Sequence, residues 1–212
     1  MTGRLVGRGR SADVYEVGGD DGGWVLRRYR DGGDAEREAR LMARLAGAGY
    51  PVPAVREAAG PDLVLERLTG PSLLDALLAG AYEPEPAGAL LANLLHRLHT
   101  LPGGVVHLDL HPGNVMLTED RGPVVIDWRT AEEGADPGLD RAMSALLLAE
   151  VAVSEEPYAP GARGGLAALL AAAPGPLLLA EARTRRAADP NLTAGEVAAL
   201  GRAEGLVRNL VG

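Results

Sequence analysis

The segment His107-Leu108-Asp109-Leu110-His111-Pro112-Gly113-Asn114, followed by Val124-Val125-Ile126-Asp127-Trp128, decides the interpretation of this chain. This stretch contains an Asp and an Asn five residues apart, and a second Asp directly after a short β-rich run. Transfer of a phosphoryl group from ATP uses these groups: one carboxylate takes the proton of the acceptor hydroxyl, while an amide and a carboxylate hold Mg²⁺ on the phosphates. We therefore predict Asp109 as the catalytic base, and Asn114 and Asp127 as catalytic ligands of the metal.

A simpler explanation is that a Pro-Gly loop between two strands carries ordinary polar turn residues. The position of Asp127 directly after Val124–Ile126 disfavours this explanation, because all three polar groups then fall at the spacing that the reaction uses. We expect His107 to pack and to orient the loop rather than to take part in the chemistry.

Composition narrows the class of protein. With 212 residues the chain can bury a sizeable core in one large or two small domains. Its net charge of −8 disfavours nucleic acid as a partner and mildly favours cationic ligands. Without cysteine there are no disulfides and no thiol chemistry. No signal peptide and no membrane-spanning segment is evident, so we expect a cytoplasmic protein with no membrane partner, its oligomeric state left open.

The first third of the chain is β-rich and the remainder mainly helical. Strands are predicted at residues 5–6, 14–17, 24–29 and 62–66, and a helix with Asp34 as its N-cap at 34–47. Further helices are predicted at 72–78, 86–99, 139–153, 165–172 and 177–188, and from the capping box at 193–196 to about 210. This order predicts an α+β, bilobal, protein-kinase-like fold: a small β-rich N-terminal nucleotide-binding lobe at residues 1–66, a hinge at 67–70 and a mainly helical C-terminal lobe at 71–212.

Residues 7–14, Gly-Arg-Gly-Arg-Ser-Ala-Asp-Val, match a glycine-rich loop between two strands. Such a loop folds over a triphosphate and offers backbone N–H groups to it, so Gly7, Gly9 and Ser11 are predicted to bind the nucleotide. In a chain with 29 glycines, a plain hairpin turn is an equally good interpretation.

Arg27 stands where kinases carry a lysine, and this chain has no lysine at all. Strand alternation places Val25 and Arg27 on one face, which we expect to face the nucleotide. Glu38 shares a face with the apolar residues of the next predicted helix, whereas Glu36 does not, so Glu38 is the predicted ion-pair partner of Arg27. The alternative is an exposed arginine beside a solvated glutamate.

Three segments carry a resemblance to a known family: residues 107–117, 125–128 and 134–140. They resemble the aminoglycoside phosphotransferase and choline kinase family, a small-molecule branch of the kinase-like fold. Its loop usually reads H-G-D-x-H-x-x-N, its metal Asp lies in I-D-W or I-D-F, and a G-D-P-x-x-D stretch follows. The resemblance covers about residues 3–150, with Leu108 and Ala135 in place of usual glycines and Arg27 in place of the usual lysine.

This resemblance implies a transferase, a small-molecule kinase that uses ATP and Mg²⁺ to phosphorylate an alcohol group. The backbone of Glu66 and Leu68 would bind adenine, and Asp140 would brace the catalytic loop from the following helix. His111, at a position where protein Ser/Thr kinases carry Lys, favours a small-molecule acceptor over a protein.

The sequence says less about the acceptor molecule than about the reaction. Acidic residues of the C-terminal half could form a pocket for an aminoglycoside-like or other amine-bearing compound, or could be ordinary solvated surface: Glu132, Glu133, Asp136, Glu150, Glu155, Glu156 and Glu181. The alternative function is that of a catalytically impaired pseudokinase, a regulatory module that binds a nucleotide or another ligand, since Arg27 and Leu108 depart from the family pattern. A protein kinase is a third and less favoured interpretation.

Overall fold

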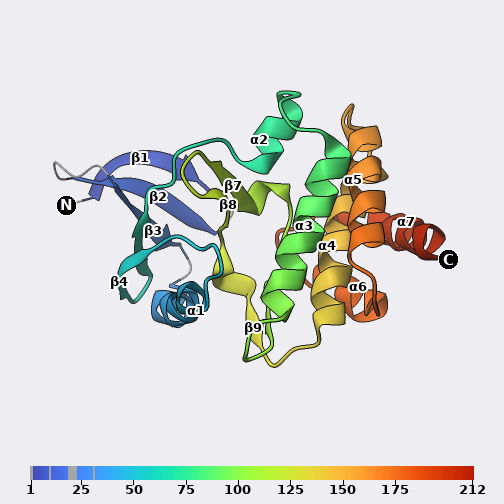
Figure 1. Cartoon of the computed structure of the whole chain (residues 1–212). Helices are drawn as coiled ribbons and strands as arrows, with labels where there is room; N and C mark the ends of the chain where they lie inside the picture. Colours follow the sequence, from blue (N-terminus) through green and yellow to red (C-terminus); the bar gives the residue numbers. More distant parts are fainter. Residues whose placement is uncertain (1, 10, 19–22, 31) are drawn as a thin grey trace. The chain divides into compact units, whose positions relative to one another are not determined.

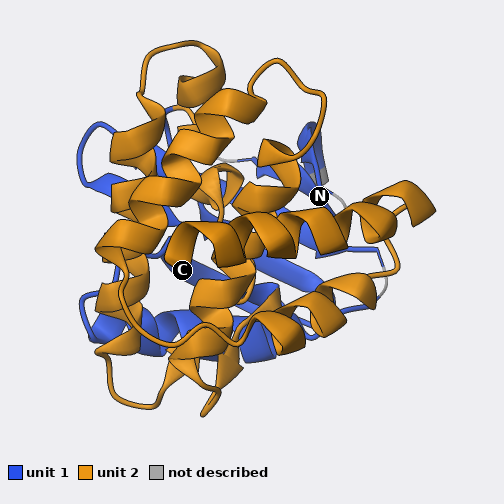
Figure 2. Ribbon diagram, turned by 90° about the vertical axis from the view of Figure 1, so that its right-hand side faces the viewer, with its two compact units in different colours: residues 1–70, 116–129 blue, residues 71–115, 130–212 orange. Residues whose placement is uncertain are grey.

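The computed structural model describes residues 2–9, 11–18, 23–30 and 32–212. They form two compact units, shown in different colours in Figure 2. The first unit comprises residues 1–70 together with 116–129, and the second comprises residues 71–115 together with 130–212. The segment that carries Asp127 therefore belongs to the first unit, while Asp109 and Asn114 belong to the second.

The first unit is built on a five-stranded antiparallel sheet in the order β1-β2-β3-β5-β4 (Figure 1). The strands are β1 (Thr2–Arg8), β2 (Ala12–Val17), β3 (Trp24–Tyr29), β4 (Val55–Ala59) and β5 (Asp62–Glu66). Arg27 lies on the central strand β3, opposite Val14 of β2 and Leu63 of β5. The predictions of β2, β3 and β5 are confirmed, and the strand predicted at residues 5–6 is longer than expected.

The edge strand β4 does not follow from the sequence pattern. Its residues, Val55–Ala59, show neither alternation of apolar and polar residues nor a β-branched run. The strand forms because it pairs with β5 and packs against α1. Pairing and tertiary packing thus override weak local propensity here.

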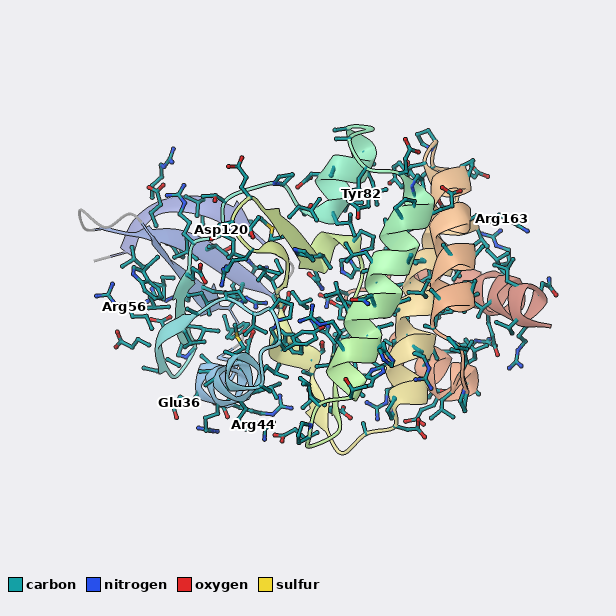
Figure 3. The ribbon with its side chains drawn as sticks, in the orientation of Figure 1. Glu36, Arg44, Arg56, Tyr82, Asp120 and Arg163 are labelled. Atoms are coloured by element: carbon teal, nitrogen blue, oxygen red, sulfur yellow. The ribbon has the colours of Figure 1, made fainter. Side chains whose placement is uncertain are left out.

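Helix α1 (Ala35–Gly47) confirms the predicted helix and its start. The Asp34 side chain accepts a hydrogen bond from the Arg37 backbone N–H at 2.9 Å, as an N-cap residue does. Its buried face includes Leu41, Met42 and Leu45, together with the carboxylate of Glu38. Glu36 and Arg44, both labelled in Figure 3, lie on the exposed side of the same helix.

A hairpin of β7 (Val115–Thr118) and β8 (Gly122–Val125) leads to Asp127. The Val125 N–H donates to the Pro51 carbonyl at 2.9 Å, which ties β8 to the segment before β4. Trp128 is fully buried, and its ring meets Tyr50 edge to face with centroids 5.6 Å apart. These contacts fix the chain on both sides of Asp127.

The second unit is mainly helical. Its helices are α2 (Leu73–Leu78), α3 (Pro84–His99), α4 (Pro137–Ala152), α5 (Ala159–Ala172), α6 (Leu179–Ala187) and α7 (Ala194–Val211). A short ladder of β6 (Val105–Val106) and β9 (Glu132–Glu133) and the 3-10 turn η1 (Pro112–Asn114) complete it. Helix α4 packs against α5, α6 and α7 and is buried on most of its sides, so it forms the centre of this unit.

Local signals locate most helix starts in this unit. The predicted capping box before α7 is confirmed by reciprocal hydrogen bonds between Thr193 and Glu196, and Ser72 and Asp75 form a second one before α2. The prediction that α5 begins at Gly165 is wrong, because the helix begins at Ala159. A Cβ atom on Gly88 of α3 would lie 2.0 Å from the Gly165 carbonyl oxygen, so glycines here allow α3 and α5 to approach closely.

Within the described part of the chain, no helix combines the length and the apolar character that crossing a membrane requires.

Candidate active site

Arg27 joins two carboxylates within the first unit. Its Nη1 atom donates to Glu38 Oε1 at 3.2 Å, and its Nη2 atom donates to Asp127 Oδ1. Only 11% of the Arg27 side chain is exposed. Burial alone would lower the pKa of Arg27, but the charges of Asp127 and Glu38 outweigh it and raise that pKa. The structure thus brings these three predicted residues together, and Arg27 is not the exposed arginine of the alternative interpretation.

Glu38 is the buried acceptor of this cluster. Besides Arg27, the Tyr29 hydroxyl donates to Glu38 Oε2 and the Trp128 backbone N–H donates to Glu38 Oε1 at 3.1 Å. Burial raises the pKa of Glu38, while the nearby guanidinium of Arg27 acts against that rise. Burial also raises the pKa of Tyr29, so its hydroxyl stays protonated and remains a donor. The sequence pattern identifies Glu38 but misses Tyr29.

Asp127 occupies a backbone conformation that few side chains adopt. Its φ angle is 63°, in the left-handed region, where Asp is tolerated better than most residues because its short polar side chain can bond locally. The carboxylate is about one third exposed, at 35%. Asp127 therefore offers oxygen atoms to a cation from a position fixed by the neighbouring Trp128 and by Arg27.

The predicted glycine-rich loop is shorter than expected. Gly7 lies inside β1 opposite Val14, so only residues 9–11 separate β1 from β2. The Gly9 N–H donates to the Ala12 carbonyl at 2.9 Å, and Arg30 Nη2 donates to the Gly9 carbonyl at 2.8 Å. The predicted extent of the loop, residues 7–14, is wrong, because residues 7–8 and 12–14 already lie in paired strands. Arg10 lies outside the described residues, and nucleotide binding by Gly7, Gly9 and Ser11 stays a prediction.

The predicted hinge begins where β5 ends. The Glu66 N–H donates to the Ala54 carbonyl at 2.9 Å, and the Glu66 carboxylate accepts from the Ala54 N–H at 2.9 Å and from Arg121 at 2.7 Å. Leu68 follows in a segment without regular secondary structure. Binding of adenine by the backbone of Glu66 and Leu68 stays a prediction.

In the second unit, the predicted catalytic loop holds Asp109 and Asn114 together. Asn114 Nδ2 donates to the Asp109 carbonyl at 2.8 Å and to Asp109 Oδ2 at 3.1 Å. With its amide nitrogen used in this way, Asn114 presents Oδ1 as its acceptor atom. The Asp109 side chain is 34% exposed, and His111 Nε2 lies 3.8 Å from Asp109 Oδ2. A hydroxyl group from solvent can therefore reach the Asp109 carboxylate.

Asp140 braces this loop from α4, as the resemblance implies. The carboxylate is fully buried and accepts from the His107 N–H at 2.9 Å and from the Leu108 N–H at 2.7 Å. His99 Nε2, at the end of α3, is a further partner at 2.9 Å. His99 was not predicted as a partner of Asp140, although a histidine in the last turn of an apolar helix was the available signal.

Leu108 carries backbone strain at the position where the family usually has glycine. Its φ angle is 64°, and the residue is only 6% exposed. For a residue with a Cβ, this conformation costs about 1–2 kcal/mol. The loop keeps the left-handed turn because Asp140 holds the Leu108 N–H, and the leucine side chain gains contacts that glycine lacks.

We predict an inverted order of stability for two variants at this position. Leu108→Ala and Leu108→Gly both lose a buried side chain, at a cost of about 2–4 kcal/mol in the free energy of unfolding. Only the glycine variant also relieves the strain, so it should be about 1 kcal/mol more stable than the alanine variant. Urea unfolding of both variants measures the difference.

The control pair is Leu91→Ala and Leu91→Gly, since Leu91 is fully buried in the middle of α3. There the alanine variant should be more stable, by about 1 kcal/mol, because glycine is a poor helix former. The same order at both positions would show that the Leu108 backbone is not strained.

Several residues of the predicted acidic pocket are paired with arginines of α6. Glu132 binds Arg185 at 2.7 Å, and Glu150 accepts two hydrogen bonds from Arg186, the shorter at 2.9 Å. Glu181 lies 3.2 Å from Arg185. Burial lowers the pKa of Arg186, but the charges of Glu150, Asp189 and Asp109 outweigh it and raise that pKa. The net negative charge available to a cationic ligand is therefore smaller than the sequence suggests.

The two predicted metal ligands, one in each unit, are of the chemical type that Mg²⁺ binds. Among the described residues, no cluster of three or more His, Cys, Asp or Glu side chains could enclose a metal ion. Mg²⁺ on a nucleotide does not need one, because water and phosphate oxygens complete its six ligands. Asp127 offers a carboxylate and Asn114 an amide oxygen, which are the hard ligands that this cation prefers.

Comparison with known proteins identifies the family of the chain. The model of the phosphotransferase enzyme family matches residues 2–103 and 59–177. A DNA damage-responsive serine/threonine-protein kinase from Deinococcus radiodurans is 32% identical over 145 residues, which are 58% of this chain and 21% of that protein. A probable serine/threonine-protein kinase from Corynebacterium efficiens is 28% identical over 100 residues, 46% of this chain and 14% of that protein. The chain thus spans about a fifth or less of these relatives. Its family match and its elements together place it in the phosphotransferase enzyme family, with the α+β kinase-like fold of that family.

Proposed function

We propose that this chain is an ATP- and Mg²⁺-dependent phosphotransferase that phosphorylates a hydroxyl group of a small molecule. The observation that carries the proposal is the formed ion pair between Arg27 and Glu38, with Asp127 on the other side of the same guanidinium. An impaired pseudokinase has no need to keep a buried cation between two carboxylates, because such a cluster costs desolvation and is often not stabilising. Family membership supports the same reaction class.

Each residue of the cluster and the loop has a role in this proposal. Asp109 orients the acceptor hydroxyl and takes its proton as the bond to phosphorus forms. Asn114 and Asp127 would hold Mg²⁺, which when bound neutralises charge on the phosphates. Arg27 contributes a fixed positive charge on the phosphate side, and Glu38 fixes the direction of its guanidinium. Asp140 acts through the loop backbone and never meets the substrate.

The acceptor is proposed to be a small hydroxylated compound. An aminoglycoside-like or other amine-bearing acceptor is favoured by the net charge of −8. Against it, Glu132 and Glu150 are neutralised by arginines of α6. A screen for acceptors should therefore include neutral and acidic hydroxyl compounds beside the amines.

A protein hydroxyl is the second candidate acceptor. Both relatives reported above are named as serine/threonine-protein kinases, and this favours it. His111 favours a small molecule, because it stands two residues after Asp109, where protein Ser/Thr kinases carry a lysine. Incubation with radiolabelled ATP and either a casein-type protein mixture or a panel of small hydroxyl compounds separates the two candidates.

The nucleotide site is tested by calorimetric titration with ATP in the presence and absence of Mg²⁺. We expect Mg²⁺-dependent binding by the wild type, and an affinity at least about tenfold lower for Asp127→Asn, since a neutral amide replaces a charged ligand. Asn adopts the left-handed conformation as readily as Asp, so the backbone at residue 127 should be kept. Without Mg²⁺ the two proteins should differ little.

The matched control is Asp62→Asn, which also removes a carboxylate paired with an arginine of β3, namely Arg28. This pair lies on the exposed side of the sheet, so MgATP binding should not change. A wild-type protein that binds no nucleotide under any condition would overturn the proposed function.

A further inference from the structure

The Tyr29 ring lies within cation–π distance of two guanidinium groups of the first unit. The Arg27 guanidinium carbon lies 5.0 Å from the centroid of the Tyr29 ring, and the guanidinium carbon of Arg129 lies 4.8 Å from it. The hydroxyl at the end of the same ring donates to Glu38. One side chain therefore touches Arg27 through its ring and reaches the ion-pair partner of Arg27 through its hydroxyl.

Strand geometry explains this arrangement. Residues two positions apart in a strand point to the same face, so Arg27 and Tyr29 of β3 share a face. Helix α1 presents Glu38 from its buried side, and the chain after β8 presents Asp127 and Arg129. All five residues belong to the first unit, and the whole cluster is formed by one compact part of the molecule.

The contacts around residue 27 suit the shape of arginine. A guanidinium is planar and offers donors along its edge while its face packs on a ring, and here the edge meets Glu38 and Asp127 while Tyr29 lies within cation–π distance. An ammonium is a compact charge on a narrower stem, without a flat face or a rigid fork. A lysine at this position has three donors on one nitrogen, but it lacks the rigid fork that spans the two carboxylates and the flat face that packs on the ring.

We propose that Tyr29 is a positioning residue that adapts this phosphate site to arginine, so that Arg27 and Tyr29 act as one device and the usual lysine cannot replace Arg27. The inference rests on the proposed function, because Arg27 and Tyr29 would act on the phosphates of a bound nucleotide. The energetic coupling between Arg27 and Tyr29 does not depend on a bound ligand and can be measured without one.

The first test therefore uses the ligand-free protein. Thermal unfolding is compared for the wild type, Arg27→Lys, Tyr29→Phe and the double variant. Each single substitution should lower Tm by about 3–8 °C, because each leaves a buried carboxylate short of a donor. The loss in the double variant should be clearly smaller than the sum of the single losses, as for residues that share one network. A loss of Tm in the double variant equal to the sum of the two single losses would overturn the proposal.

Two control variants make the same chemical changes on the same sheet. Arg28→Lys alters the neighbouring arginine, which is half exposed and bound to Asp62. Tyr15→Phe removes a hydroxyl from β2, outside the cluster. Alone or combined, these two should change Tm little, because exposed ion pairs contribute only about 0–1 kcal/mol.

The second test measures MgATP affinity by calorimetry, and the KM for ATP and kcat of any transfer activity. Arg27→Lys and Tyr29→Phe should each weaken MgATP binding about tenfold. Tyr29→Phe should raise KM for ATP more than it lowers kcat, because the phosphate-side cation is displaced while Asp109 is untouched. A lysine variant that binds MgATP as tightly as the wild type, or more tightly, would overturn the proposal.

Failure of the proposed function and failure of the coupling between Arg27 and Tyr29 give different results. If the wild type binds no nucleotide, the proposed function is wrong, while the unfolding experiment still decides whether Arg27 and Tyr29 are coupled. If the wild type binds MgATP but the variants behave additively and bind equally well, the site works without the device.

Discussion

Replacing Asp109 by Asn should lower the rate of phosphate transfer about a hundred- to ten-thousandfold, the range that loss of a general base produces. The substitution keeps the size of the side chain and an oxygen that can accept from Asn114 Nδ2. The backbone contacts of residue 109, with the His107 ring and with Asn114, do not depend on the carboxylate charge. We therefore expect unchanged unfolding in urea and unchanged MgATP affinity, with the loss confined to the transfer step measured in a single turnover.

The matched control is Asp120→Asn, at a largely exposed carboxylate in the turn between β7 and β8, labelled in Figure 3. It changes charge and shape in the same way without touching the catalytic loop, so transfer should continue at the wild-type rate. If Asp109→Asn also transferred phosphate at that rate, Asp109 would not be the base. The protein would then use another base, or it would be the regulatory module of the alternative interpretation.

Replacing Asp140 by Ala should cost about 3–5 kcal/mol of unfolding free energy, because it leaves buried donors without an acceptor. The carboxylate is fully buried and binds the His107 and Leu108 N–H groups and the His99 ring. Urea unfolding gives the loss directly, and the surviving folded fraction should transfer phosphate poorly because the loop turn at Leu108 is released.

The control for this experiment lies on the same helix. Asp136 caps the N-terminus of α4, where its carboxylate accepts from the Gly138 N–H at 2.7 Å. Asp136→Ala should cost only about 1 kcal/mol, the usual value of an N-cap. A similar loss for Asp140→Ala and Asp136→Ala would show that Asp140 serves the helix and not the loop.

How far the sequence could predict the molecule depends on the range of each interaction. The loop that carries Asp109 and Asn114 is local, and the bond between them joins residues five apart in the chain. The partnership of Arg27 and Glu38 follows from two short-range rules, alternation along a strand and one buried face along a helix. Helix starts at Asp34, Ser72 and Thr193 were predictable for the same reason, because the hydrogen bonds of an N-cap join residues within one helical turn.

Longer-range contacts escaped prediction. Tyr29 carries no motif, and its role arises only because α1 and the chain after β8 meet around it. His99 and Asp140 are brought together by the packing of helices far apart in the sequence. Helix α5 was predicted to begin at Gly165 but begins at Ala159, and its glycines allow the close approach to α3. In each case a tertiary contact supplied what local propensity lacked.

The presence of arginine at residue 27 also decides how such a protein can be detected. Reagents that label kinases by acylating the lysine beside the ATP phosphates depend on an amine that can lose its proton. A guanidinium in proteins stays protonated and is a poor nucleophile, and the surrounding carboxylates raise the pKa of Arg27 further. With no lysine anywhere in the chain, such probes have no side-chain amine to acylate. Surveys of kinases by lysine chemistry should therefore not label this chain, even if it binds the nucleotide that we propose.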